Sequence, residues 1–126
     1  MKVDKKIKSK RSNWKFDKNV VNNFDKHVIQ SVPFYKISHD LTLNLSDFFL
    51  KQKSICYDLG CSTGTLLNAM QKRHNTKLIK FYGFDQSNEM IKKAKKNNKK
   101  INFLKKDLED IKFKKSDLIF SLYTIQ

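Results

Sequence analysis

The stretch Ser54-Ile55-Cys56-Tyr57-Asp58-Leu59-Gly60-Cys61-Ser62-Thr63-Gly64 decides the fold class of this 126-residue chain. Its first six residues form a short apolar run that ends at a glycine, which is typical of a buried strand. Residues 60–64 read as a loop, and an apolar helical pattern begins at Thr65. A strand that passes through a glycine loop into a helix predicts the first unit of an α/β fold.

The same alternation continues on both sides of this stretch. Phe16 to Pro33 and Tyr35 to about Leu50 have the apolar spacing of amphipathic helices, and we expect their Phe-rich stripes to lie in the core. The C-terminal side predicts a helix to about His74, a strand over 77–84, a helix over 88–97 capped by Ser87, and strands over 101–104 and 118–123. This order predicts right-handed crossovers and a parallel sheet.

Length and composition indicate one domain in a reducing compartment. A chain of this length with 39% hydrophobic residues can bury one core. Residues 1–13 are polar and rich in lysine, so we expect a basic disordered tail, with the domain over residues 14–126. The N-terminus lacks the apolar run of a signal peptide. Cys56 and Cys61 are too few for a disulfide framework, so we expect a soluble cytoplasmic protein without a membrane partner.

The charge balance is strongly basic, with 27 Lys and Arg against 12 Asp and Glu and a net charge of +15. An excess of positive charge of this size is compatible with electrostatic attraction to RNA. Only Arg11 and Arg73 are arginines, however, and arginine is the usual residue for bidentate phosphate and base contacts. We therefore interpret the lysines as a solvated surface that reflects codon bias, with direct nucleic-acid binding as the alternative.

Acidic residues follow three of the predicted strands, and they indicate a nucleoside site. Asp58 ends the first strand, Asp85 ends the second and Asp107 follows the third. Ligands of parallel sheets bind beyond these carboxyl ends. The glycine loop lets backbone amides approach a ligand, Asp85 can accept both ribose hydroxyl hydrogens, and Asp107 can accept from the exocyclic amine of adenine.

The sequence motif of the loop favours S-adenosylmethionine over NAD as the ligand. It reads Asp58-x-Gly60-x-x-x-Gly64 and lacks the Gly-x-Gly-x-x-Gly pattern of dinucleotide sites. Because S-adenosylmethionine has a zwitterionic tail and no pyrophosphate, an acidic residue inside the motif is compatible with its binding.

The chain's three histidines have no metal-ligand spacing, so we expect structural or surface roles for them, with His27 also helping to order Tyr35.

These motifs resemble a known family. Tyr57 to Gly64, with Gly83-Phe84-Asp85, looks like the cofactor site of a class I S-adenosylmethionine-dependent methyltransferase. The lead-in from Phe16 to Tyr35, which includes Phe24-Asp25-x-His27-Val28 and Ser31-Val32-Pro33, is similar to that of carboxy-S-adenosylmethionine synthases, as is the ending Tyr123-Thr124-Ile125-Gln126. The resemblance runs from about Trp14 to the last residue. It implies a Rossmann-like fold with strand order 3-2-1-4, followed by further strands.

The residues themselves point to Asp58, Gly60, Gly64, Asp85 and Asp107 as cofactor-binding positions. The resemblance implies these additional contacts: Tyr35, Cys61, Ser62, Gln86 and Leu108. It assigns no catalytic residue and no metal ligand. The expected partners are a small-molecule substrate, prephenate on this interpretation, and a second copy of the chain in a homodimer.

Carboxy-S-adenosylmethionine synthases use S-adenosylmethionine and prephenate, and their product later modifies the wobble uridine of tRNA. Two features depart from that pattern. Leu122 stands where the synthases usually have an asparagine, and the arginine that holds the substrate carboxylate belongs to their C-terminal half. We therefore expect an N-terminal portion of a longer enzyme, truncated after the fourth strand and inactive alone. An ordinary class I methyltransferase and a non-catalytic cofactor-binding fragment are the alternatives.

Overall fold

The structure is a computed structural model that describes residues 18–124, with side chains from residue 21 onward. The predicted tail over residues 1–13, the domain start at residue 14 and the last two residues lie outside this range. The described elements, in chain order, are α1 (Lys18–Ser31), α2 (Tyr35–Phe49), β1 (Ile55–Leu59), α3 (Thr65–Arg73), β2 (Lys80–Asp85), α4 (Asn88–Asn97), β3 (Asn102–Lys105), the short 3-10 helix η1 (Leu108–Asp110) and β4 (Leu118–Phe120).

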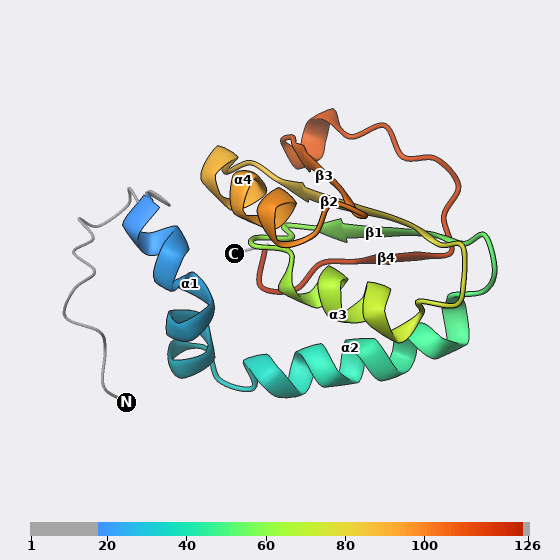
Figure 1. Cartoon of the computed structure of the whole chain (residues 1–126), viewed down its shortest axis with the longest axis horizontal. Coiled ribbons are helices and arrows are strands. Elements are labelled where there is room, and N and C mark those ends of the chain that lie inside the picture. The colour runs from blue at the N-terminus through green and yellow to red at the C-terminus, as the bar shows by residue number, and fades with distance from the viewer. Residues whose placement is uncertain (1–17, 125–126) are drawn as a thin grey trace.

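The strands form one parallel sheet in the order β3-β2-β1-β4, which confirms the predicted fold class and strand order. Helices α3 and α4 lie on the same face of this sheet, and α2 lies outside α3 (Figure 1). In the central pair, Asp58 is in register with Gly83 and Leu59 with Phe84. The carboxyl ends of β1 and β2, which carry Asp58 and Asp85, therefore lie side by side.

Two strands are shorter than predicted. β2 begins at Lys80 rather than Lys77, because the Lys77 N–H donates to the His74 carbonyl (3.0 Å) in a turn that follows α3. β4 ends at Phe120 rather than Tyr123, because the chain turns there and Tyr123 has a φ of 57°. This turn directs Tyr123 toward α2, where its hydroxyl lies 3.0 Å from Ser38 Oγ.

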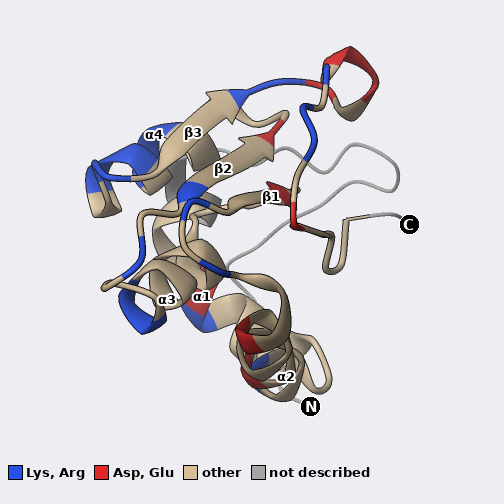
Figure 2. Ribbon diagram, turned by 90° about the vertical axis from the view of Figure 1, so that its right-hand side faces the viewer, with Lys and Arg blue, Asp and Glu red and all other residues tan. Residues whose placement is uncertain are grey.

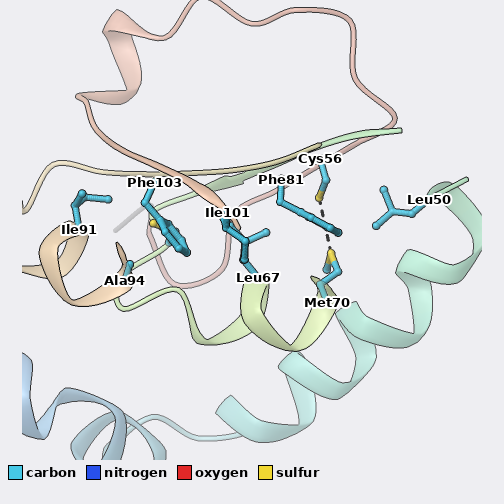
Figure 3. Packing of buried hydrophobic residues seen from close by; sticks show 10 residues of the cluster. Leu50, Cys56, Leu67, Met70, Phe81, Ile91, Ala94, Ile101 and Phe103 are labelled. Carbon is cyan, nitrogen blue, oxygen red and sulfur yellow. Dashed lines mark hydrogen bonds between the residues drawn. The ribbon is translucent and has the colours of Figure 1, made fainter. Parts of the chain in front are cut away.

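The main core lies between the sheet and the helices α3 and α4. Figure 3 shows side chains of the strands meeting side chains of both helices. Cys56 Sγ lies 3.8 Å from Met70 Sδ, a contact that joins β1 to α3. The two helices bury these side chains in the core: Leu66, Leu67, Met70, Met90, Ile91 and Ala94.

The opposite face of the sheet carries stacked aromatic rings. Tyr57 stacks on Tyr82 and Phe84, with ring centroids 5.3 and 5.8 Å apart. Phe113 meets Tyr57 edge-on at 5.4 Å, and the Lys114 N–H donates to the Tyr57 hydroxyl (3.4 Å). The segment between η1 and β4 thus covers part of this face without a long helix.

The prediction that the Phe-rich stripes lie in the core is wrong for α2. Phe48 is 77% exposed and Phe49 50% exposed, and Ile37, Leu41 and Leu45 are also exposed. The reason is that α2 contacts the remainder of the chain mainly along α3, through a side that includes the buried Ser46. Its outer apolar side faces solvent.

Charged residues are distributed unevenly over the fold. Figure 2 shows Lys residues on α4 and at the end of β3, and acidic residues at the ends of β1 and β2. The lysine-rich surface and the acidic strand ends are therefore different regions of the molecule. None of the described helices is long and apolar enough to cross a membrane.

A substitution at Gly83 tests how tightly this core is packed. A Cβ at this position would lie 2.7 Å from Phe103 Cδ1 and 2.9 Å from both Cys61 Sγ and Leu67 Cδ1. We expect Gly83→Ala to lower the free energy of unfolding by about 1–3 kcal/mol, the usual cost of overpacking. Urea denaturation measures the change, with Gln86→Ala at an exposed position as the control. Equal stability of Gly83→Ala and wild type would contradict this packing.

Candidate functional site

The glycine loop folds back tightly against β2. Gly60 and Gly64 have φ values of 83° and 78°, a region that only glycine enters at little cost. The N–H groups of Gly60 and Cys61 both donate to the Phe84 carbonyl, at 2.8 and 2.9 Å. The loop is therefore fixed at the carboxyl end of the sheet, and Gly64 directly precedes the first residue of α3.

Asp85 holds this loop in place. One oxygen of its carboxylate accepts from the Ser62 N–H (2.9 Å) and the other from the Ser87 N–H (2.8 Å). Burial raises the pKa of Asp85, while these two backbone hydrogen bonds act in the opposite direction. Because each carboxylate oxygen can accept a further hydrogen bond, Asp85 can still bind a ribose diol. Its structural role between loop and α4 was not predicted from the sequence.

Asp58 is buried beside the loop, with an exposed fraction of 4%. Burial, and secondly the negative charge of Asp85, raise the pKa of Asp58 to about 8. Its carboxyl is therefore largely neutral at neutral pH, and a cationic group placed next to it would favour the carboxylate.

A cavity of about 270 Å³ opens between this loop and the two N-terminal helices. One wall comes from the end of β1, the loop and the start of α3: Asp58, Gly60, Cys61, Ser62, Thr63, Thr65 and Leu66. The other wall comes from α1, α2 and their connection, with two residues that follow β4: Phe24, His27, Val28, Ser31, Val32, Tyr35, His39, Leu122 and Tyr123.

Aromatic rings form one part of the helical wall. Tyr35 lies against His39 and Tyr123, with ring centroids 4.2 and 5.7 Å apart. Burial, followed by the charges of Asp25 and Asp58, raises the pKa of Tyr35 to about 12, so its phenol keeps its proton. Tyr123 was not among the predicted site residues, because the sequence pattern placed it within a strand.

Asp25 attaches α1 to the loop wall. Its carboxylate accepts hydrogen bonds from Thr63 Oγ1 (2.6 Å) and Thr65 Oγ1 (3.2 Å). On the other side, Lys93 of α4 donates to the Val21 carbonyl (2.7 Å) and lies 3.8 Å from Asp25. These contacts fix the α1 wall of the cavity relative to the glycine loop, a role that the sequence analysis did not assign to Asp25.

The structure brings only part of the predicted site together. Five predicted residues line the cavity: Tyr35, Asp58, Gly60, Cys61 and Ser62. Asp85 supports the loop from behind through Ser62. The remaining predicted contacts, Gly64, Gln86, Asp107 and Leu108, are not among the residues lining this cavity, and their contact with a cofactor stays a prediction.

The cysteines and histidines show no sign of nucleophilic or metal chemistry. Burial raises the pKa of the Cys56 and Cys61 thiols, so both remain protonated. The buried His74 lies 2.8 Å from Ser46 Oγ, a contact between α3 and α2. Within the part of the chain that the structure describes, no group of three or more His, Cys, Asp or Glu residues could hold a metal ion.

A parallel 3-2-1-4 sheet, a glycine loop after β1 and an acid at the end of β2 define a Rossmann-like nucleoside-binding domain. The chain belongs to the methyltransferase domain family, which matches residues 56–126.

The resemblance to carboxy-S-adenosylmethionine synthases is also confirmed. The chain is 32% identical over 124 residues to the synthase of Wolinella succinogenes, covering 92% of this chain and 50% of that protein. It is 37% identical over 117 residues to the synthase of Nitratiruptor sp., covering 90% of this chain and 48% of that protein. The chain thus spans about half the length of these curated relatives.

Solved structures support the same family. A putative S-adenosylmethionine-dependent methyltransferase of Methanococcus maripaludis matches with a TM-score of 0.65 and 25% identity, over 93% of this chain and 55% of that one. The plantazolicin methyltransferase BpumL, crystallised with SAH (S-adenosylhomocysteine), matches with a TM-score of 0.61 and 26% identity, over 82% and 41%. S-adenosylmethionine is thus the cofactor that the family and these neighbours support for this chain.

The buried carboxyl of Asp58 predicts a pH dependence of stability. A carboxyl with a raised pKa binds its proton more tightly in the folded chain, so its contribution to stability is lost as the pH rises from about 4 to about 8. Asp58→Asn removes this loss, so the stability of the variant relative to wild type should increase between about pH 5 and pH 8.

Urea denaturation at several pH values measures this difference in unfolding free energy. Asp107→Asn makes the same chemical change at an exposed position and serves as the control. A difference in unfolding free energy between Asp58→Asn and wild type that stays constant with pH would contradict the raised pKa of Asp58.

Proposed function

We propose that this chain is the cofactor-binding part of an enzyme that converts S-adenosylmethionine and prephenate into carboxy-S-adenosylmethionine. The observation that carries the proposal is the composition of the cavity. Its loop wall has the methyltransferase motif, and its helical wall consists of the lead-in segment that resembles the synthases. The 32–37% identity to synthases extends over 90–92% of the chain, so it includes both walls.

The residues present fit this cofactor. Asp85, at the end of β2, has acceptor positions for a ribose diol, and the loop contributes Gly60 to the cavity lining. Asp58 offers a carboxyl to the ammonium of the methionine tail, which would favour its anionic form. Asp107, with Gln86 and Leu108, would contact the adenine end. When bound, S-adenosylmethionine supplies a sulfonium that activates its methyl carbon.

The helical wall excludes water and places an aromatic surface near the cofactor. Phe24, Val28, Val32 and Leu122 are apolar residues of this wall, and Leu66 is apolar on the opposite side. The stacked Tyr35 and Tyr123 rings present π faces, which attract a cationic group such as a sulfonium. Tyr35 holds its proton and therefore adds no negative charge to this surface.

A specific observation favours a second candidate, an ordinary methyltransferase. The structure places Leu122 in the cavity lining, at a position where the synthases usually have an asparagine. An apolar side chain there removes a hydrogen-bonding group from the substrate region. The proposed carboxyl transfer would place the product in tRNA wobble-uridine modification, whereas a methyltransferase would act on a different acceptor.

Mass spectrometry of the reaction product tests the proposal. We expect residues 1–126 alone to be inactive. A chimera that continues from Gln126 into the C-terminal half of the Nitratiruptor relative should convert S-adenosylmethionine and prephenate into a product heavier by one carboxyl group, with release of phenylpyruvate. Turnover by the short chain would contradict the need for a second half. A chimera that ignores prephenate but yields S-adenosylhomocysteine with an acceptor would favour the methyltransferase.

A further inference from the structure

Two polar side chains of α1 line the cavity on the wall that faces the glycine loop. His27 and Ser31 are one helical turn apart, and His27 Nε2 lies 3.5 Å from Ser31 Oγ. Both side chains are partly buried. The contacts of Asp25 with Thr63 and Thr65 keep this part of α1 next to the loop. The pair is therefore positioned to meet a molecule that shares the cavity with the cofactor.

The cavity lining contains few side chains that can carry a positive charge. Asp58 lies on the loop wall, and none of the described residues that line the cavity is lysine or arginine. Only His27 and His39 of the lining can therefore carry a positive charge. Burial lowers the pKa of His39, against the opposing charges of Asp40 and Asp25, and its ring lies tilted against Tyr35. His27 is thus the basic side chain of the lining best placed to donate a hydrogen bond to an anionic group.

We propose that His27 and Ser31 form a subsite for a carboxylate of the co-substrate. The proposal rests on the proposed function, which requires an acidic co-substrate beside S-adenosylmethionine. An imidazole N–H and a hydroxyl on one helix face can each donate to one carboxylate oxygen, and a protonated imidazole strengthens its hydrogen bond.

His27 and Ser31 are not among the proposed cofactor contacts, which lie on the loop wall, at the strand ends and at Tyr35. From the sequence, His27 was expected only to help order Tyr35. The structure instead places the His27 ring near Ser31, while Tyr35 lies against His39 and stacks on Tyr123. The first half of the chain therefore supplies donors of its own for an acidic substrate.

Calorimetric titration of prephenate or phenylpyruvate into the 126-residue chain saturated with S-adenosylhomocysteine tests the subsite. His27→Gln keeps a hydrogen-bond donor but removes the basic imidazole ring, and it should weaken prephenate binding by about tenfold, as expected for a lost hydrogen bond to a carboxylate. Ser31→Ala should also weaken binding, whereas His27→Arg, which keeps a donor and a charge, should retain most of it. Lys26→Gln removes a neighbouring charge on the exposed side of α1 and should leave the affinity unchanged.

The outcomes separate this inference from the proposed function. Equal prephenate affinity of His27→Gln, Ser31→Ala and wild type would overturn the subsite, as would absence of prephenate and phenylpyruvate binding to a wild-type chain that binds S-adenosylhomocysteine. If Lys26→Gln weakened prephenate binding as much as His27→Gln, the loss would reflect the overall charge of the helix rather than a specific contact. That result would also overturn the subsite. Selective weakening together with a chimera that makes no carboxylated product would support the subsite and contradict the proposed reaction. The affinity for S-adenosylhomocysteine, measured for each variant, shows whether the variant is folded.

Discussion

The Asp85 carboxylate, which accepts hydrogen bonds from the Ser62 and Ser87 backbone N–H groups, is the contact on which the site depends. It connects the glycine loop to the end of β2 and to the first turn of α4. Once the loop is fixed, Asp58 and Gly60 line the cavity. The same carboxylate has remaining acceptor positions for a ligand, so one acid serves both the fold and the proposed cofactor contact.

The loop in turn positions the N-terminal helices. Thr63 and Thr65, which flank the end of the loop, bind Asp25 of α1, and Lys93 of α4 holds the same helix from the other side. The cavity therefore consists of segments far apart in the sequence, of which α1 is held by hydrogen bonds to the loop region and α2 by contacts with α3. The turn after β4 completes it, because Tyr123 reaches Tyr35 and Ser38 only through its left-handed backbone conformation.

The sequence predicted the parts of this structure that depend on local patterns. Apolar spacing identified the elements, and the strand-end acids Asp58 and Asp85 lie at the expected edge. Three features could not be read from such patterns. The Asp25 contacts and the Tyr35–Tyr123 stacking depend on tertiary placement, and the exposure of Phe48 on α2 depends on which side of a helix finds a neighbour. Apolar periodicity predicts a helix but does not show what covers each of its sides.

The central claim is that the loop held by Asp85 binds S-adenosylmethionine or its demethylated product. Isothermal titration of S-adenosylhomocysteine and NAD into the chain tests it most directly. The account predicts binding of S-adenosylhomocysteine in preference to NAD. It also predicts a loss of about 1–3 kcal/mol of binding free energy in Asp85→Ala, with an unchanged circular dichroism spectrum. Equal binding of the two ligands, or equal affinity of Asp85→Ala and wild type for S-adenosylhomocysteine, would contradict it.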